Sequence, residues 1–420
     1  MTTSRRRVLL LHTTTGYQAE DFLRAARNLQ VEAVVGTDRC HQLDDPWGDG
    51  AIALRFEDPE ASVQTIVEEA NKAPFDAIVP VGDRPTMVAT LAARALGLLH
   101  NPPQAARVCR NKFLSRRSFQ SAGLLVPEFS CHPLSADPKE AASRAPFPCV
   151  LKPLALGASR GVIRADDGQE FVAAFRRLKE LLETREIRAL KDGANEKILV
   201  EGFIEGREVA LEGLIDRGRL RPLALFDKPD PLDGPFFEET LYVTPSRLEA
   251  GPQEQIVRTA EKAAQAAGLF HGPVHAELRV NEKGAWILEV AGRSIGGLCS
   301  RALRFASGLS LEELILRHSL GLEIESDRLE GGASAVMMIP IPKGGILQRA
   351  DGLEEARAVE GVEDVILTAK LRQVLVPPPE GASYLGFIFA RDSSPERVED
   401  VIRRAHQTLR FTITPALAVG

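Results

Sequence analysis

The segment at residues 271–297 constrains the fold of this chain more than any other, and it reads HGPVHAELRVNEKGAWILEVAGRSIGG. Its apolar-rich runs, 274–280 and 285–290, flank the polar stretch 281–284 (NEKG). Strand-forming runs on either side of a short polar segment with glycine are typical of a β-hairpin, because glycine accepts the left-handed backbone of such turns. We therefore predict two antiparallel strands here.

The register of this hairpin decides which side chains meet. If Asn281 pairs with Ala285 across a three-residue loop, Glu277 lies directly opposite Glu289. Because strand side chains alternate between faces, His275 then shares the face of both glutamates. Carboxylates in such a cross-strand pair lie about 5 Å apart and repel each other. We therefore expect positive charge next to them.

Two sources of that charge fit the sequence. A hard divalent cation such as Mg²⁺ takes oxygen ligands and is typically held by one or two carboxylates together with substrate phosphates. Alternatively, Arg279 and Arg293 lie near enough in the sequence to neutralise the pair as ordinary ion pairs. The hairpin alone leaves both interpretations open.

Length and charge limit the classes to which the chain can belong. Its 420 residues predict two to four domains, and the hydrophobic content of 44% with 26% charged residues is that of a soluble globular protein. The net charge of -6 provides no broad attraction to nucleic acid or to an anionic membrane. We expect neither as a partner.

The sequence has no pattern typical of membrane or secreted proteins. The apolar run after the first arginines covers only Val8 to Leu11, which is too short for the core of a signal peptide, and no stretch approaches 18 apolar residues. The cysteines show neither C-x-x-C nor zinc spacing, so we expect reduced thiols in a cytoplasmic protein. They are Cys40, Cys109, Cys131, Cys149 and Cys299.

Residues 7–100 alternate short apolar runs with helical patterns, which predicts a parallel sheet with crossover helices. The first turn, at 12–16, lacks G-x-G-x-x-G, so this Rossmann-like region has no dinucleotide fingerprint. Asp83 follows a predicted strand end, where open sheets bind ligands, but a helix N-cap ahead of Pro85 explains it equally well.

The central region combines basic residues with a glycine-rich loop. A basic amphipathic helix is predicted from Lys112 to Ser121, and a later strand ends at Lys152. The loop after that strand contains Gly157 and Ser159, and backbone N–H groups of such loops can bind phosphates. It does not match the Walker A pattern.

Two further segments have a less specific pattern. Residues 197–216 predict two strands with a break at Gly206, and glutamates on strands are usually exposed. The segment 227–246 is predicted as a loop that is both acidic and aromatic. Its Glu239 is the best candidate to bind an amino group, and Phe236 and Phe237 are candidates for an apolar pocket, although a solvated loop packing on the core is the alternative.

The order of these motifs strongly resembles that of the ATP-grasp superfamily. The motifs H-A-E-L-R and L-E-V-A-G-R-S-I-G-G of the hairpin region are most similar to the L-amino acid ligase branch, and the resemblance covers roughly residues 5–325, followed by a further C-terminal domain. It implies α/β and α+β multidomain architecture: a Rossmann-like domain at 1–107, an ATP-grasp domain at 108–325 with a lid at about 150–205, and a small α+β domain at 326–420. That last domain would cover the active site or form a homodimer.

The resemblance implies a role for each motif. Lys112 and Lys152 would contact the phosphates of ATP, and the loop with Gly157 and Ser159 would close over them. Backbone groups of Glu201, Phe203 and Ile204 would bind adenine, and Glu208 would bind the ribose. Glu277 and Glu289 would bind Mg²⁺, with Mn²⁺ as an alternative ion. Three further residues, Arg293, Glu239 and His275, complete the site that the resemblance implies.

Arg293 would stabilise a phosphoryl oxygen or a developing oxyanion, with an ion pair to Glu289 as the simpler alternative. Glu239 would bind a substrate amine, and His275 would have a supporting role. One position departs from the superfamily, because many members have a metal-binding asparagine two residues after the second glutamate and this chain has Ala291. Whether one or two ions bind is therefore open.

Such a site implies an ADP-forming carboxylate–amine ligase that acts through an acylphosphate on small-molecule carboxylate and amine substrates, among which amino acids are expected. A purine-biosynthetic or carboxylase-like ligase is the nearest alternative. A nucleotide-binding protein without catalytic activity is another, and retention of both lysines, both glutamates and Arg293 argues against it.

Overall fold

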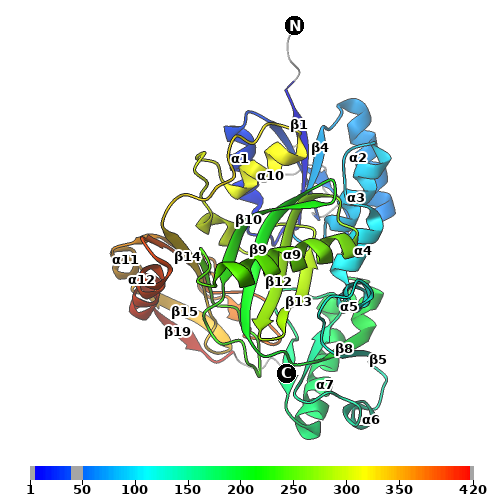
Figure 1. The fold of residues 1–420 in the computed structure, drawn as a ribbon, viewed down its shortest axis with the longest axis vertical. Coiled ribbons are helices and arrows are strands. Elements are labelled where there is room, and N and C mark those ends of the chain that lie inside the picture. Colours follow the sequence, from blue (N-terminus) through cyan, green and yellow to red (C-terminus); the bar gives the residue numbers. More distant parts are fainter. Residues whose placement is uncertain (1–4, 39–50, 417–420) are drawn as a thin grey trace.

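The computed structural model describes residues 5–38 and 51–416 (Figure 1), so Cys40 lies outside the described residues. The N-terminal part is a parallel sheet with the strand order β3-β2-β1-β4, as the alternating pattern predicts. Segments that follow β1 and β4 line the main cavity, as expected for the carboxyl ends of parallel strands. The elements are β1 (Arg7–His12), α1 (Ala19–Asn28), β2 (Glu32–Thr37), β3 (Ile52–Ala53), α2 (Pro59–Lys72), β4 (Ala77–Val81) and α3 (Thr86–Ala95).

Two short helices lead from this sheet to the rest of the chain: α4 (Pro103–Arg110) and α5 (Lys112–Ser121). Asn111 separates them, because its backbone is extended and its side chain accepts hydrogen bonds from the amides of Phe113 and Leu114. This cap starts α5 at Lys112, where the sequence predicted it.

An antiparallel sheet with the strand order β5-β8-β6-β7 forms a separate lobe. Its helix α7 buries Phe171, Phe175 and Leu178 against the strands. The lobe begins at Phe129, about twenty residues before the predicted start of the lid. Its elements are β5 (Phe129–Pro133), α6 (Pro138–Ala142), β6 (Cys149–Pro153), β7 (Ile163–Ala165), α7 (Gly168–Leu182), α8 (Arg185–Arg188), the 3-10 helix η1 (Gly193–Glu196) and β8 (Lys197–Gly202).

An eight-stranded sheet with the order β13-β12-β9-β10-β11-β14-β18-β16 forms the centre of the molecule. Helix α9 crosses one of its faces (Figure 1), and its alanines pack there on Val274, Ala276 and Leu278. The opposite face of these strands lines the cavity. The elements up to α10 are β9 (Arg207–Asp216), β10 (Arg219–Asp227), β11 (Leu241–Thr244), α9 (Ala250–Ala267), β12 (His271–Asn281), β13 (Gly284–Ala291), η2 (Cys299–Ala302) and α10 (Leu311–Ser319).

The C-terminal part continues this central sheet with β14, β18 and β16, so the sheet crosses the predicted domain boundary at residue 326. A three-stranded sheet, β17-β15-β19, and two helices complete the region. The predicted small α+β character is therefore observed. The elements are β14 (Ala333–Ile339), β15 (Gly345–Asp351), α11 (Leu353–Arg357), β16 (Val362–Leu367), β17 (Val374–Leu375), β18 (Gly386–Asp392), α12 (Pro395–Thr408) and β19 (Arg410–Thr414).

The hairpin of β12 and β13 has the predicted pairing of Glu277 with Glu289, although its turn differs from the prediction. Asn281 pairs with Gly284, so the loop has two residues instead of three. A β-bulge at Leu288 adds one residue to β13 and restores the register of the glutamates. Among residues 5–38 and 51–416, no helix has the length and apolar character needed to cross a bilayer.

Candidate functional site

A cavity of about 540 Å³ lies where the N-terminal sheet, the β5–β8 lobe, the central sheet and the C-terminal region meet. The residues that the sequence analysis assigned to ATP, metal and substrate binding line this cavity, from Lys112 to Arg293. Phe237 also lines it, but Phe236 does not and packs on the core of the β5–β8 lobe. On β9 and β12 the alternation of side chains directs Glu208, His275 and Glu277 into it. The structure therefore brings the predicted residues together, while their individual roles remain predictions.

The two opposed glutamates are neutralised by lysine and histidine. Lys112 Nζ lies 3.2 Å from Glu289 Oε2, and Lys228 Nζ lies 3.3 Å from Glu277 Oε1. His275 Nε2 is 3.2 Å from the same oxygen of Glu277. Burial would raise the pKa of Glu277, but Lys228 and His275 hold it well below its ordinary value. This carboxylate is therefore ionised at neutral pH.

The arginines that the sequence offered for this purpose have other partners, so that interpretation was wrong. Arg279 Nε donates to Glu208 Oε2 at 3.0 Å, and its Nη1 donates to the Ile204 carbonyl at 2.6 Å. Arg293 Nε donates to Asp83 Oδ1 at 2.9 Å. This contact also excludes the N-cap interpretation of Asp83, because no side chain caps α3.

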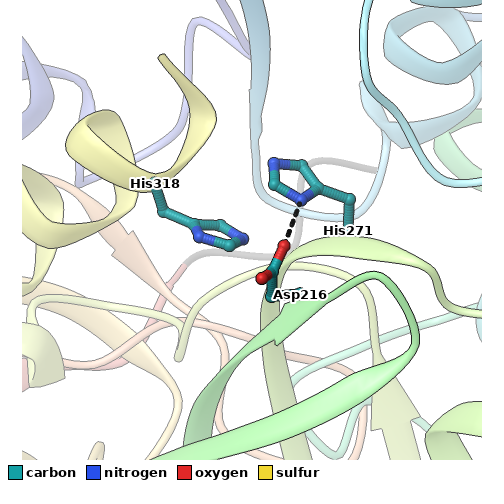
Figure 2. A group of neighbouring side chains, drawn as sticks. All are labelled: Asp216, His271 and His318. Atoms are coloured by element: carbon teal, nitrogen blue, oxygen red, sulfur yellow. Dashed lines mark ion pairs between the residues drawn. The ribbon is translucent and has the colours of Figure 1, made fainter. Parts of the chain in front are cut away.

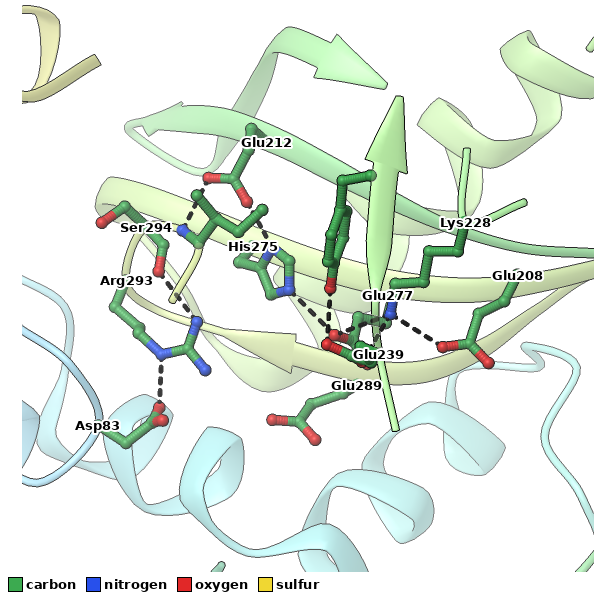
Figure 3. A network of polar contacts seen from close by, with 12 residues as sticks. Asp83, Glu208, Glu212, Lys228, Glu239, His275, Glu277, Glu289, Arg293 and Ser294 are labelled. Atoms are coloured by element: carbon green, nitrogen blue, oxygen red, sulfur yellow. Dashed lines mark hydrogen bonds and ion pairs between the residues drawn. The ribbon is translucent and has the colours of Figure 1, made fainter. Parts of the chain in front are cut away.

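Lys228 is a buried cation at the centre of the site, and the sequence analysis did not identify it (Figure 3). Its Nζ donates to Glu208 Oε1 at 2.9 Å and to Glu239 Oε1 at 2.7 Å, in addition to its contact with Glu277. Burial would lower the pKa of Lys228, but these three carboxylates raise it well above its ordinary value. Its only sequence signal is a lysine directly after an apolar strand, which is a common pattern.

Glu239 lies between this lysine and an aromatic hydroxyl, since Tyr242 Oη donates to Glu239 Oε2 at 2.7 Å. Burial and the nearby charge of Glu277 raise the pKa of Glu239. The cluster thus holds four carboxylates (Glu208, Glu212, Glu239 and Glu277) and three cations (Lys228, Arg279 and His275). The excess of negative charge would favour binding of an ammonium group.

His275 connects Glu277 to a second buried carboxylate. Its Nδ1 contacts Glu212 Oε1, while Glu212 Oε2 accepts a hydrogen bond from the Ile295 amide at 3.1 Å. Burial would lower the pKa of His275, but Glu212 and Glu277 raise it to about 9. The imidazolium form therefore predominates at neutral pH. A protonated imidazole can hold the Glu277 carboxylate in position, but it cannot accept a proton as a general base.

Lys152 is held by Glu201 beside the glycine-rich loop. Its Nζ lies 2.7 Å from Glu201 Oε2, and the fully buried Arg116 contacts the same carboxylate. Burial would raise the pKa of Glu201, but Arg116 and Lys152 lower it to about 2. The lysine is therefore fixed at the cavity wall, where it is 15% exposed.

The predicted adenine-binding segment is partly engaged within the protein. The Phe203 amide donates to the Pro148 carbonyl at 2.8 Å, and the Ile204 carbonyl accepts from Arg279. The Phe203 ring lies between two guanidinium groups, with the carbons of Arg164 and Arg279 at 4.2 and 4.9 Å from its centroid. These contacts fix the segment at the mouth of the cavity.

The loop at 156–161 is fixed at both ends. Lys112 Nζ donates to the Leu156 carbonyl at 2.9 Å, and the Gly161 amide donates to the Pro379 carbonyl of the C-terminal region at 2.7 Å. Ala158 and Ser159 both have a φ of 53°, which is unusual for residues with a side chain. The loop therefore follows a tight left-handed path along the cavity.

Glu277 and Glu289 are the residues best placed to hold a divalent ion. Their side chains are 20% and 24% exposed, and each keeps oxygen lone pairs that the lysines do not use. A second acidic group, formed by Glu208, Glu239 and Glu277, already surrounds the Lys228 ammonium. A carboxylate pair is a suitable donor set for Mg²⁺. Ala291 is buried and contributes no ligand.

A separate cluster of Asp216, His271 and His318 lies outside the cavity (Figure 2). The histidine rings stack with centroids 4.1 Å apart and an angle of 22° between their planes. An ion binds in the plane of an imidazole ring, so two nearly parallel stacked rings cannot share one without reorienting. His318 Nε2 is also within 2.9 Å of the Ile215 carbonyl. The arrangement supports a packing role for both histidines.

Comparison with known proteins agrees with this geometry. Residues 145–302 match the ATP-grasp domain family, and residues 337–414 match the L-amino acid ligase C-terminal domain 2. The crystal structure of an L-amino acid ligase from Bacillus licheniformis superposes with a TM-score of 0.82 at 26% identity, covering 98% of this chain and all of that one.

Other relatives match a smaller part of this chain or have a lower identity. The alanine–anticapsin ligase of Bacillus subtilis is 27% identical over 61% of this chain, which corresponds to 56% of the relative. A phosphoribosylglycinamide synthetase from Anaerococcus prevotii, at 15% identity and a TM-score of 0.68, shares the fold. Both matched domains and the full-length superposition place this chain in the ATP-grasp superfamily, in its L-amino acid ligase branch.

Proposed function

We propose that this protein is an ATP-dependent ligase that joins the carboxylate of one substrate to the amine of another, with release of ADP and phosphate. The observation that carries the proposal is the pair Glu277 and Glu289, opposed on one cavity wall together with Lys112, Lys152 and Arg293. A protein that only bound a nucleotide would have no need for an arginine and a carboxylate pair at the reacting end.

The chemistry consists of two displacements. A carboxylate oxygen attacks the γ-phosphorus of ATP, and the bond to the leaving ADP oxygen breaks, which gives an acylphosphate. The amine then attacks the acyl carbon, and the bond to phosphate breaks. Starting from an ammonium and a carboxylate, the products are an amide, ADP, phosphate and one proton. Since no protein nucleophile is needed, positioning and charge compensation carry the catalysis.

The chain supplies cations where anionic oxygens would lie. Lys112 and Lys152 would bind phosphate oxygens, with the loop at 156–161 closing over them. Glu277 and Glu289 would hold Mg²⁺ or Mn²⁺, which would neutralise charge on the phosphates. The Arg293 guanidinium, oriented by Asp83, would stabilise the oxygens of the transferring phosphoryl group and of the tetrahedral intermediate.

Amino acids are the substrates that the site favours. The excess negative charge around Lys228 offers Glu239 as a partner for an amino group, and Arg293 with the adjoining glycines Gly296 and Gly297 offers a place for a carboxylate. The similarity to amino acid ligases supports the same class.

The test is ADP release with ATP and Mg²⁺, screened over pairs of amino acids and small carboxylic acids. We expect release that requires both co-substrates and that is lost in Glu289→Ala. The matched control is Glu282→Ala, which removes an exposed glutamate from the turn of the same hairpin and should retain activity. Binding of ATP without release for any pair would refute the ligase assignment, provided that mass spectrometry of products formed in cell extract also detects no amide.

A further inference from the structure

One end of the cavity is closed by side chains from three distant parts of the chain. Tyr17 comes from the N-terminal region, Cys299 from the segment after β13, and Met338 and Tyr384 from the C-terminal region. Behind them lies Phe387, which is fully buried and contacts the ring of Tyr17 edge-on with centroids 5.7 Å apart. The centroid of Tyr384 is 6.3 Å from that of Phe387. The C-terminal region thus contributes directly to the wall.

This wall lies next to the carboxylate proposed to bind an amine. The Met338 amide donates to the Thr240 carbonyl at 2.8 Å, and Thr240 directly follows Glu239. On the paired strand, Tyr242 lies opposite Val336, which shares the strand face of Met338. An amino acid with its ammonium at Glu239 would therefore direct its side chain along Met338, Cys299 and Tyr384.

The chemistry of the wall restricts what it can accept. Its side chains are a thioether, a thiol and two phenol rings, all uncharged at neutral pH. Burial and the negative charges of Glu239 and Glu212 raise the pKa of the Cys299 thiol far above its usual range, so it stays protonated. A charged side chain placed against this surface would lose water without gaining a partner.

We infer that Met338 and Tyr384 form a specificity pocket for the amino acid whose amino group binds at Glu239, and that the preferred side chain is uncharged and apolar. The inference rests on the proposed ligase function and adds the substrate class. Methionine can adapt to different apolar partners, and the Phe387 ring behind the wall limits the depth of the pocket.

The neighbouring residue on β14 provides a matched control. Met337 and Met338 are buried to a similar extent, at 3% and 4% exposure, but they point to opposite faces. Met338 lines the cavity, while Met337 packs with Leu241 and Ile388 in a separate core. Truncating either should weaken packing similarly, but only Met338→Ala enlarges the pocket.

The experiment measures kcat/KM for alanine, methionine, phenylalanine, aspartate and lysine, each with the saturating co-substrate found in the activity screen. The ratio of two kcat/KM values in one preparation does not depend on the fraction of folded enzyme. We expect the wild type to use the apolar amino acids at least tenfold better than the charged ones. Met338→Ala should raise the phenylalanine-to-alanine ratio about tenfold, while Met337→Ala leaves it unchanged.

The possible results distinguish a failure of the proposed ligase function from a failure of the specificity pocket. Absence of co-substrate-dependent ADP release in the wild type would overturn the proposed function itself. Turnover that favours aspartate or lysine, or ratios that match in Met338→Ala and Met337→Ala, would overturn the specificity pocket while leaving the ligase assignment intact. If Met338→Ala fails to fold, Tyr384→Ala changes a half-buried position and should shift the same ratio.

Discussion

Glu201 provides a sharp test of the electrostatic description of the site, because its charge is both buried and doubly paired. The side chain is 1% exposed and contacts Arg116 and Lys152. Its pKa falls from an ordinary 4.5 to about 2 in the folded protein. A difference of this size corresponds to about 3 kcal/mol of folding free energy at neutral pH.

The sign follows from the depressed folded-state pKa. Above the unfolded value of 4.5 the stabilisation is fully present, and it is lost as the pH falls toward the folded value of about 2. From these two values, about 1 kcal/mol of the contribution of Glu201 disappears between pH 7 and pH 3.5. Glu201→Gln removes the titrating group, so its stability should lack this part of the pH dependence.

The assay is urea unfolding followed by far-ultraviolet circular dichroism at both pH values. At pH 7, Glu201→Gln should be less stable than the wild type by about 3 kcal/mol or more, because Arg116 is left buried without its anion. At pH 3.5 the difference should narrow by about 1 kcal/mol. Glu196→Gln, an exposed position just before β8, is the control and should stay within about 0.5 kcal/mol of the wild type. A stability gap of the same size at both pH values would refute the reasoning.

Two further perturbations test separate parts of the site. Lys228→Met leaves three adjoining carboxylates without their shared cation, so the variant should lose about 3 to 5 kcal/mol of stability at pH 8 and recover part of it at pH 5.5, when a carboxyl takes up a proton. Equal deficits at both pH values, measured by urea unfolding, would contradict this account. Glu380→Gln weakens the contacts of 2.6 and 3.0 Å that tie Arg177 of α7 to the C-terminal region, so the dissociation constant for ADP should rise up to about fivefold. Glu183→Gln, which loses an ion pair with Arg188 inside the lobe, is the control, and an identical effect of both changes on a fluorescent ADP analogue would argue against coupling to the C-terminal region.

The sequence predicted the pairing of Glu277 with Glu289, but it did not predict the turn and the bulge that produce this pairing. Alternation and glycine placement predicted Glu277 opposite Glu289, and the structure has this pairing. The three-residue loop was wrong, however, and the register depends on a two-residue turn followed by a bulge at Leu288. A bulge adds one residue at a position that local pattern does not mark, so the two errors compensated each other. The helix predicted from Lys112 to Ser121 was recovered with the same bounds, because its cap at Asn111 is a local signal.

The sequence could not predict which charged side chains from distant elements pair with one another. Arg279 lies two residues after Glu277, yet it pairs with Glu208, which lies directly opposite on the neighbouring strand β9. Lys228 reaches Glu277 because β10 ends beside the same cavity. Long-range packing decides which strands become neighbours in the central sheet. Proximity in the sequence therefore pointed to Arg279 and Arg293 as the cations that neutralise the glutamate pair, although lysines from other elements, together with a histidine of β12, have that role.

The resulting arrangement explains how a site rich in buried charge can exist before substrates arrive. Glu289 is paired with Lys112, Glu277 with Lys228 and His275, and Glu201 with Lys152. Each lysine proposed to meet a phosphate therefore already has an anionic partner, and an unpaired buried charge would cost several kcal/mol. If Lys112 turned to an incoming phosphate oxygen, Glu289 would become free to bind the cation that accompanies the nucleotide. Exchange of partners in this sense would keep every charge compensated, so removal of either Lys112 or Glu289 should weaken nucleotide binding.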